Sequence, residues 1–113
     1  MTVTVENIDS IIAEAQDAAQ AAAHQFYQDR LGGQDQYACG FAWVHISGIK
    51  GNTKVGRRLK DLGIKPAYQG GLQWWNPSGH MCQNVDTKEE GARVAADVLR
   101  NYGITAYVGS RLD

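Results

Sequence analysis

A short internal repeat limits the folds that this chain can adopt. Leu59-Lys-Asp-Leu-Gly-Ile64 is similar to Leu99-Arg-Asn-Tyr-Gly-Ile104, forty residues further on, and Ala, Tyr and Gly follow each segment. In both copies a helical pattern ends at a glycine, which readily closes a helix, and continues into an extended segment. The repeat therefore predicts two halves, each built from a strand, a helix and a strand.

Short runs of aromatic and β-branched residues indicate the strands of these halves. Four strands are predicted: Phe41–Ile46, Leu72–Trp75, His80–Val85 and Thr105–Val108. Asn76-Pro-Ser-Gly79 has the composition of a turn, so the second and third strands should form a hairpin.

Two helices should connect the strands within the halves. Their expected bounds are Asn52 or Thr53 to about Leu62, and Thr87 to Tyr102. Thr87 and Glu90 have the spacing of a capping box, which predicts the start of the second of these helices.

An alanine-rich helix is predicted before both halves, over residues 7–31. Seven alanines lie between Ala13 and Ala23, and alanine has the highest helix propensity. The apolar stripe of this helix has small residues at its middle, so whatever packs there can approach closely. Two glycines end the helix and begin a linker over residues 32–40.

The complete pattern is this helix followed by βαββαβ over residues 41–110, in a single domain of 113 residues. The order predicts a ferredoxin-like α+β fold, with a four-stranded antiparallel sheet and the N-terminal helix added to it. Because both crossovers should be right-handed, the two later helices should share one face of the sheet and leave the other face open.

Strand alternation assigns aromatic side chains to this open face. The expected residues are Phe41, Trp43, His45, Tyr107 and either Trp74 or Trp75. Rings of this size form an apolar patch that needs a cover. Three covers are open at this point: the alanine-rich helix, a second subunit, or a ligand such as single-stranded nucleic acid.

Charge is distributed unevenly along the chain. Residues 1–40 carry six acids against one base, and residues 41–70 carry six bases against one acid. The bases proposed to contact phosphates or an acidic protein surface are Lys50, Lys54, Arg57 and Arg58. The alternatives are that this basic helix presents a solvated face, or that it pairs with the acidic N-terminal helix, within one chain or between two. No P-loop spacing occurs, so nucleotide hydrolysis is not indicated.

His45, His80 and Cys82 are the candidate catalytic residues. Antiparallel pairing of the first and third strands would place Cys82 opposite His45, with His80 on the diagonal and Met81 and Val85 pointing inward. A Cys–His pair can act as nucleophile and base, and the three side chains could hold zinc. However, a buried cysteine commonly behaves as a small hydrophobe, and the pattern lacks a fourth ligand. We therefore favour a protein without metal, cofactor or enzymatic activity.

The composition excludes several classes of protein. A net charge of -1 with 43% hydrophobic residues excludes a disordered chain and a uniformly basic nucleic-acid binder. No apolar run reaches the ~18 residues of a membrane-spanning helix, and the N-terminus lacks the layout of a signal peptide. Two cysteines, Cys39 and Cys82, are too few for a disulfide framework, which predicts a reducing cytoplasm.

Two segments resemble known binding modules. The βαββαβ order with aromatic residues on a central strand resembles RNA recognition modules, although residues 80–85 lack the aromatic signature of their third strand. The strand–glycine–helix entry at Val44–Val55 resembles ACT regulatory domains, which bind amino acids at a subunit interface, without their D-x-P-G turn.

Three further segments resemble small proteins of tailed phages of marine bacteria. They are Cys39–His45, Gly71–Gly79 and Tyr107–Asp113. The resemblance covers residues 37–113 and implies an accessory viral protein in the cytoplasm of a bacterial host. It brings no assigned catalytic or binding residue.

The predicted function is the binding of another macromolecule by a non-enzymatic homodimer, through the basic helix and the exposed aromatic residues. One alternative is an enzyme or metal site at His45, His80 and Cys82. The other is a protein that binds single-stranded nucleic acid through the same basic helix and aromatic face.

Overall fold

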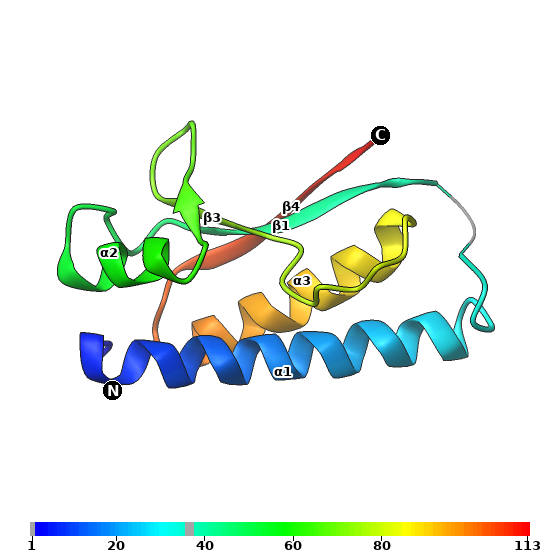
Figure 1. Ribbon diagram of the computed structural model, residues 1–113, viewed down its shortest axis with the longest axis horizontal. Coiled ribbons are helices and arrows are strands. Elements are labelled where there is room, and N and C mark those ends of the chain that lie inside the picture. The colour runs from blue at the N-terminus through cyan, green and yellow to red at the C-terminus, as the bar shows by residue number, and fades with distance from the viewer. Residues whose placement is uncertain (1, 36–37) are drawn as a thin grey trace.

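A computed structural model describes residues 2–35 and 38–113 of the protein (Figure 1). Within these residues, helices and strands alternate after a long first helix. The elements are α1 (Val5–Asp29), β1 (Gly40–Ile46), α2 (Lys54–Asp61), β2 (Lys65–Pro66), β3 (Leu72–Trp75), α3 (Val85–Asn101) and β4 (Ala106–Leu112). The predicted linker over residues 32–40 includes residues 36 and 37, which lie outside the described part of the chain.

The four strands form one antiparallel sheet in the order β2-β3-β1-β4. β1 is central, and its longest pairing is with β4, from Gly40 opposite Leu112 to Ile46 opposite Ala106. The predicted α+β class, the four-stranded antiparallel sheet and the separate N-terminal helix are thus confirmed.

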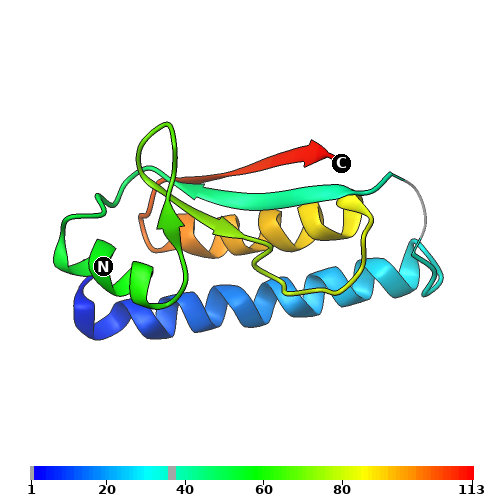
Figure 2. The same cartoon turned by 45° about the horizontal axis from the view of Figure 1, so that its top comes forward.

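One face of the sheet is covered by α3, and α1 packs on the side of α3 that faces away from the sheet (Figures 1 and 2). Small residues allow this close helix packing. A Cβ atom on Gly91 of α3 would lie 2.7 Å from the Ser78 Cβ and 3.4 Å from the Ala19 carbonyl oxygen of α1. The alanine-rich stripe therefore packs on a helix, and α1 does not cover the open face of the sheet.

The core lies between β1 and the helices. Ala42, Val44 and Ile46 of β1 point into it, as strand alternation predicted, and Leu99 of α3 is fully buried against them. Apolar area of this kind is the main source of folding free energy. None of the described helices is long and apolar enough to span a membrane.

The predicted strand at His80–Val85 is wrong. Residues 80–83 form neither helix nor strand, and the segment meets the sheet in an isolated bridge between Cys39 and Asn84. The Asn84 side chain accepts a hydrogen bond from the Thr87 amide at 2.8 Å and caps α3, so the helix starts before the predicted capping box. The expected inward position of Met81 is also wrong, since its side chain is exposed.

The hairpin lies one connection earlier than predicted. β3 pairs with the two-residue strand β2, and the chain reverses over residues 67–71, where Gly70 and Gly71 have positive φ values of 98° and 71°. Gly71 also lies so close to the Ile46 carbonyl that a Cβ atom would be 2.5 Å from its oxygen. Glycine is therefore required at this position for both conformation and space.

Candidate functional site

Strand register gathers aromatic side chains on the sheet face opposite α3, which we call the aromatic face. Its residues are Phe41, Trp43 and His45 of β1, Lys65 of β2, Gln73 and Trp75 of β3, and Tyr107, Gly109 and Arg111 of β4. This confirms the predicted orientation of β1 and of Tyr107. It also settles the choice on β3, because Trp75 lies on this face and Trp74 packs against the core.

Three of the rings form a continuous cluster. The ring centres of Trp43 and Trp75 are 5.1 Å apart, and Phe41 meets Trp75 edge-on at 5.9 Å. These are favourable geometries for aromatic pairs. Trp75 nevertheless remains 45% exposed, so the cluster presents ring surface to solvent.

A glycine on β4 makes room for the central ring. The indole of Trp43 lies over Gly109, its cross-strand partner, in the space that a Cβ atom would occupy. Any larger residue at position 109 would overlap the indole. The position of Trp43 on the sheet thus depends on Gly109.

A second ring pair lies beside this cluster. His45 stacks on Tyr107 with ring centres 4.8 Å apart, and its Nδ1 lies 3.2 Å from the Gln69 side-chain amide. The His45 residue is 3% exposed, whereas Tyr107 is 49% exposed. His45 is therefore the buried ring of this stacked pair, and Tyr107 is the ring that solvent can reach.

Basic side chains lie beside the Phe41 ring and at the β2 edge of the aromatic face. The Arg111 guanidinium and the Lys88 ammonium lie 5.4 Å and 5.3 Å from the centre of the Phe41 ring. Lys65 is exposed on the same face, opposite Gln73. The strand residues of the aromatic face include no carboxylate, so this surface suits an anionic partner.

The predicted cluster of His45, His80 and Cys82 is not formed. His45 lies on the aromatic face, whereas residues 80–84 leave the sheet. His80 packs against Tyr27 of α1, with the two ring centres 4.8 Å apart. The error follows from the strand predicted there, because only that strand would have placed Cys82 opposite His45.

The environments of His80 and Cys82 shift the pKa values of both side chains. Burial, followed by the nearby charge of His24, lowers the pKa of His80. Burial raises the pKa of the Cys82 thiol, so less of the reactive thiolate is present near neutral pH. Within residues 2–35 and 38–113, no three potential metal-ligating side chains come together.

The basic helix is used partly within the chain. Arg58 donates to both carboxylate oxygens of Asp9 on α1, at 2.9 and 2.7 Å, and Arg57 donates to the Asn52 carbonyl at 2.8 Å. The hydrogen bond from Arg58 lowers the pKa of Asp9. The predicted pairing of the basic and acidic helices therefore occurs within one chain, while Lys50 and Lys54 stay exposed.

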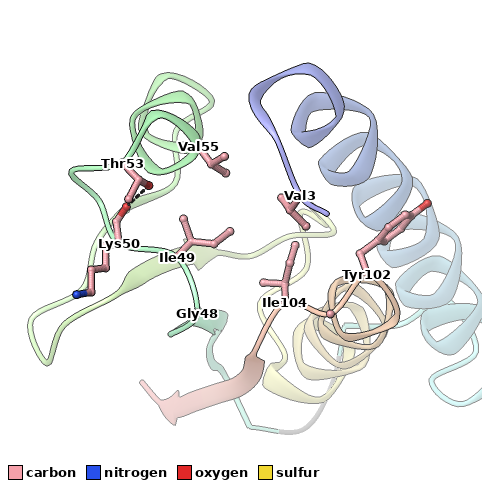
Figure 3. A pocket seen from close by; sticks show the side chains of 9 residues that line it. Val3, Gly48, Ile49, Lys50, Thr53, Val55, Tyr102 and Ile104 are labelled. Atoms are coloured by element: carbon pink, nitrogen blue, oxygen red, sulfur yellow. Dashed lines mark hydrogen bonds between the residues drawn. The ribbon is translucent and has the colours of Figure 1, made fainter. Parts of the chain in front are cut away.

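A cavity of about 560 Å³ lies between the N-terminal residues, the start of α2 and the end of α3 (Figure 3). Apolar side chains line most of it: Val3, Ile49, Val55, Tyr102 and Ile104. The Lys50 side chain extends away from this space, and the Thr53 hydroxyl is occupied by a hydrogen bond to the Lys50 carbonyl at 2.7 Å. The lining offers no acid–base pair, so we assign no chemistry to it.

Sequence reasoning missed Gly109 and the basic members of the aromatic face. Arg111 and Gly109 follow from the alternation that placed Tyr107, had the last strand been extended beyond Val108. Lys65 had no such signal, because a two-residue strand containing a proline shows no periodicity.

Comparisons with known proteins found no match to this chain. No family model matches the chain, and neither curated proteins nor solved structures give a significant match.

Proposed function

We propose that the protein is a non-enzymatic binding protein that holds single-stranded nucleic acid on its aromatic face. The observation that carries the proposal is the combination of half-exposed rings, Trp75 and Tyr107, with the basic residues Lys65 and Arg111 on strands that bring no carboxylate to that face. Stacking on aromatic rings and phosphate contacts with basic residues are the two terms that hold single strands on proteins.

An unpaired base is a better partner for these rings than an acidic protein surface. The bases of a single strand present planar faces that stack on aromatic rings, and the strand carries one phosphate charge for each nucleotide. An acidic protein surface would satisfy Lys65 and Arg111 and leave the ring surfaces unmatched. A duplex has its bases stacked internally and would bind more weakly.

The proposal also includes a ferredoxin-like fold class and an origin among phage proteins. The βαββαβ order and the strand order β2-β3-β1-β4 support a ferredoxin-like classification, with α1 added on the far side of α3. A place among accessory proteins of tailed phages, acting in the host cytoplasm, rests on the three sequence segments alone.

Fluorescence anisotropy of labelled oligothymidylate and oligouridylate tests the proposal. We expect binding near physiological salt, and a loss of about 5- to 150-fold in Trp75→Ala, since stacking of one base on an aromatic side chain is worth ~1–3 kcal/mol. Met81→Ala is the matched control, because Met81 is an exposed apolar residue outside the sheet. Arg111→Ala should make the slope of log K against log salt less steep by ~0.7, the amount expected for the loss of one phosphate contact.

Two results would overturn the proposal. One is the absence of binding to either oligonucleotide at low salt. The other is binding that Trp75→Ala and Arg111→Ala leave unchanged. A folded protein that binds no oligonucleotide, and that associates with itself until Trp75 is replaced, would instead assign the aromatic face to a second copy of the chain.

A further inference from the structure

The two edges of the sheet differ in how they are protected. The β2 edge is two residues long and consists of an exposed lysine and a proline, both of which discourage pairing with another strand. The β4 edge is seven residues long and contains no proline. Among the residues that the structure describes, no element lies beyond β4 on this side in either view (Figures 1 and 2).

Hydrogen bonds at both ends of the β1–β4 ladder show which backbone groups of β4 are free. The Ser47 amide donates to the Thr105 carbonyl, and the Asp113 amide donates to the Cys39 carbonyl, each at 3.0 Å. In an antiparallel ladder the residues that bond to the neighbour alternate with residues that point away. Odd-numbered residues of β4 therefore bond to β1, and even-numbered residues direct their amides and carbonyls outward.

One of these outward groups already has a partner. The Arg100 guanidinium donates to the Ala106 carbonyl at 2.6 Å, which confirms that this carbonyl faces away from β1. Val108, Ser110 and Leu112 remain, and no hydrogen bond to their outward backbone groups is seen from the described residues. Three successive outward positions of an edge strand are thus available for pairing.

We infer that β4 pairs with β4 of a second copy, antiparallel, with Ser110 on the two-fold axis. In this register Ser110 lies opposite Ser110, and Val108 lies opposite Leu112 of the second copy, so that all three free residues exchange hydrogen bonds with their counterparts. A shift toward the start of β4 would bring in Ala106, whose carbonyl Arg100 holds, and a shift toward its end would leave Val108 without a counterpart in β4. Self-pairing with closed two-fold symmetry is the commonest mode of homodimer formation.

The side chains at this edge fit the same register. Leu112 is 66% exposed and points to the helix side of the sheet, as Val108 does. An open groove of about 360 Å³ lies beside Val108, and Phe26, Asp86, Glu89 and Arg93 contribute to its lining. Leu112 of the second copy, directly opposite Val108, would enter this groove and cover its own exposed surface.

Such a dimer has one eight-stranded sheet in which two aromatic faces lie on the same side. On that side Arg111 of one copy lies opposite Gly109 of the other, next to the indole that rests on Gly109. A cation close to an indole is favourable. The dimer extends the aromatic face without covering it, so this inference does not depend on the ligand proposed above.

Sedimentation equilibrium of the full chain and of Ser110→Pro tests the inference. The wild type should be a dimer, and the variant a folded monomer, because proline at 110 removes an outward amide and leaves the bonds to β1 intact. Ser110→Ala keeps the amide and should remain a dimer. A monomeric wild type at the highest concentration reached would overturn the inference, as would a dimer that survives Ser110→Pro and is lost in Trp75→Ala.

Disulfide cross-linking tests the register and does not require the proline variant to fold. In a chain whose exposed Cys39 is replaced by serine, Ser110→Cys should give a covalent dimer on oxidation. Cα atoms of a hydrogen-bonded antiparallel pair are ~5.5 Å apart, within the range for disulfides. Leu112→Cys is the matched control, because its counterparts would be ~13 Å apart along the strand. Cross-linking at 112 but not at 110 would contradict the register.

Discussion

The two faces of the sheet are built from the same strands and have opposite characters. Toward α3, β1 presents Ala42, Val44 and Ile46, which are at most 1% exposed. On the other side it presents Phe41, Trp43 and His45, which the chain covers in part with residues from β3, β4 and the β2–β3 loop. The larger side chains thus lie on the less covered face. Folding alone does not require this arrangement, because large apolar side chains gain most by full burial.

The largest expected difference between the faces is in stability. Leu99→Ala should lower the free energy of unfolding by about 2–5 kcal/mol, because Leu99 is fully buried and its truncation leaves a cavity. Trp75→Ala removes a larger side chain and should have a smaller effect, since Trp75 is half exposed and its ring pairs are worth ~0.5–1.5 kcal/mol each. Urea unfolding of both variants measures the difference. Equal or reversed losses would show that the aromatic face belongs to the core.

The next effect concerns the position of Trp43. Gly109→Val should displace the indole, because a side chain at 109 would overlap it, and crowding of this kind costs ~1–3 kcal/mol. We expect a red-shifted tryptophan emission and weaker oligonucleotide binding. Ser110→Ala on the same strand is the control and should change neither property. An unchanged spectrum in Gly109→Val would mean that Trp43 does not rest on this glycine.

A smaller effect is expected at the segment that joins β3 to α3. The Asp35 carboxylate accepts from the Gln83 and Asn84 amides at 2.7 and 3.0 Å and from the Asn84 side chain at 2.9 Å. The hydrogen bond from the Asn84 side chain is the main cause that lowers the pKa of Asp35 below its ordinary 3.8. A lowered pKa means that this stabilisation is complete above the ordinary value and is lost as pH falls through the lowered one.

Asp35→Asn should therefore be less stable than the wild type at neutral pH and lose less stability on acidification. Unfolding curves of both proteins between neutral and strongly acidic pH measure the difference, which should shrink as pH falls. Binding to the aromatic face should not change in this variant. A constant difference at all pH values would show that the Asp35 charge does not hold residues 83–84.

Periodicity and helix signals in the sequence predict most of the covered face. The repeat at Leu59–Ile64 and Leu99–Ile104 corresponds to the ends of α2 and α3, and the alternation along β1 assigns both faces correctly. These signals are local, and each comes from several residues that act together. The same alternation found the four rings of the aromatic face that belong to β1 and β4.

The errors arose where the structure depends on few residues or on distant ones. Residues 80–84 have the composition of a strand but form none, and Asp35, far away in the sequence, holds residues 83 and 84 by hydrogen bonds to their amides. β2 consists of two residues whose strand character comes only from pairing with β3. The docking of α1 on α3 depends on small residues, which permit close approach to a helix or to a sheet equally well.

The central claim is that the aromatic face is the surface that the protein uses, and its three tryptophans allow one direct test. Trp43 and Trp75 lie opposite each other on that face, whereas Trp74, whose cross-strand partner is Val44, packs on the core side. Titration with oligothymidylate, followed by the three indole N–H signals in NMR spectra, should shift Trp43 and Trp75 and leave Trp74 almost unchanged. Shifts confined to Trp74, or none in any indole at saturating oligonucleotide, would contradict the account.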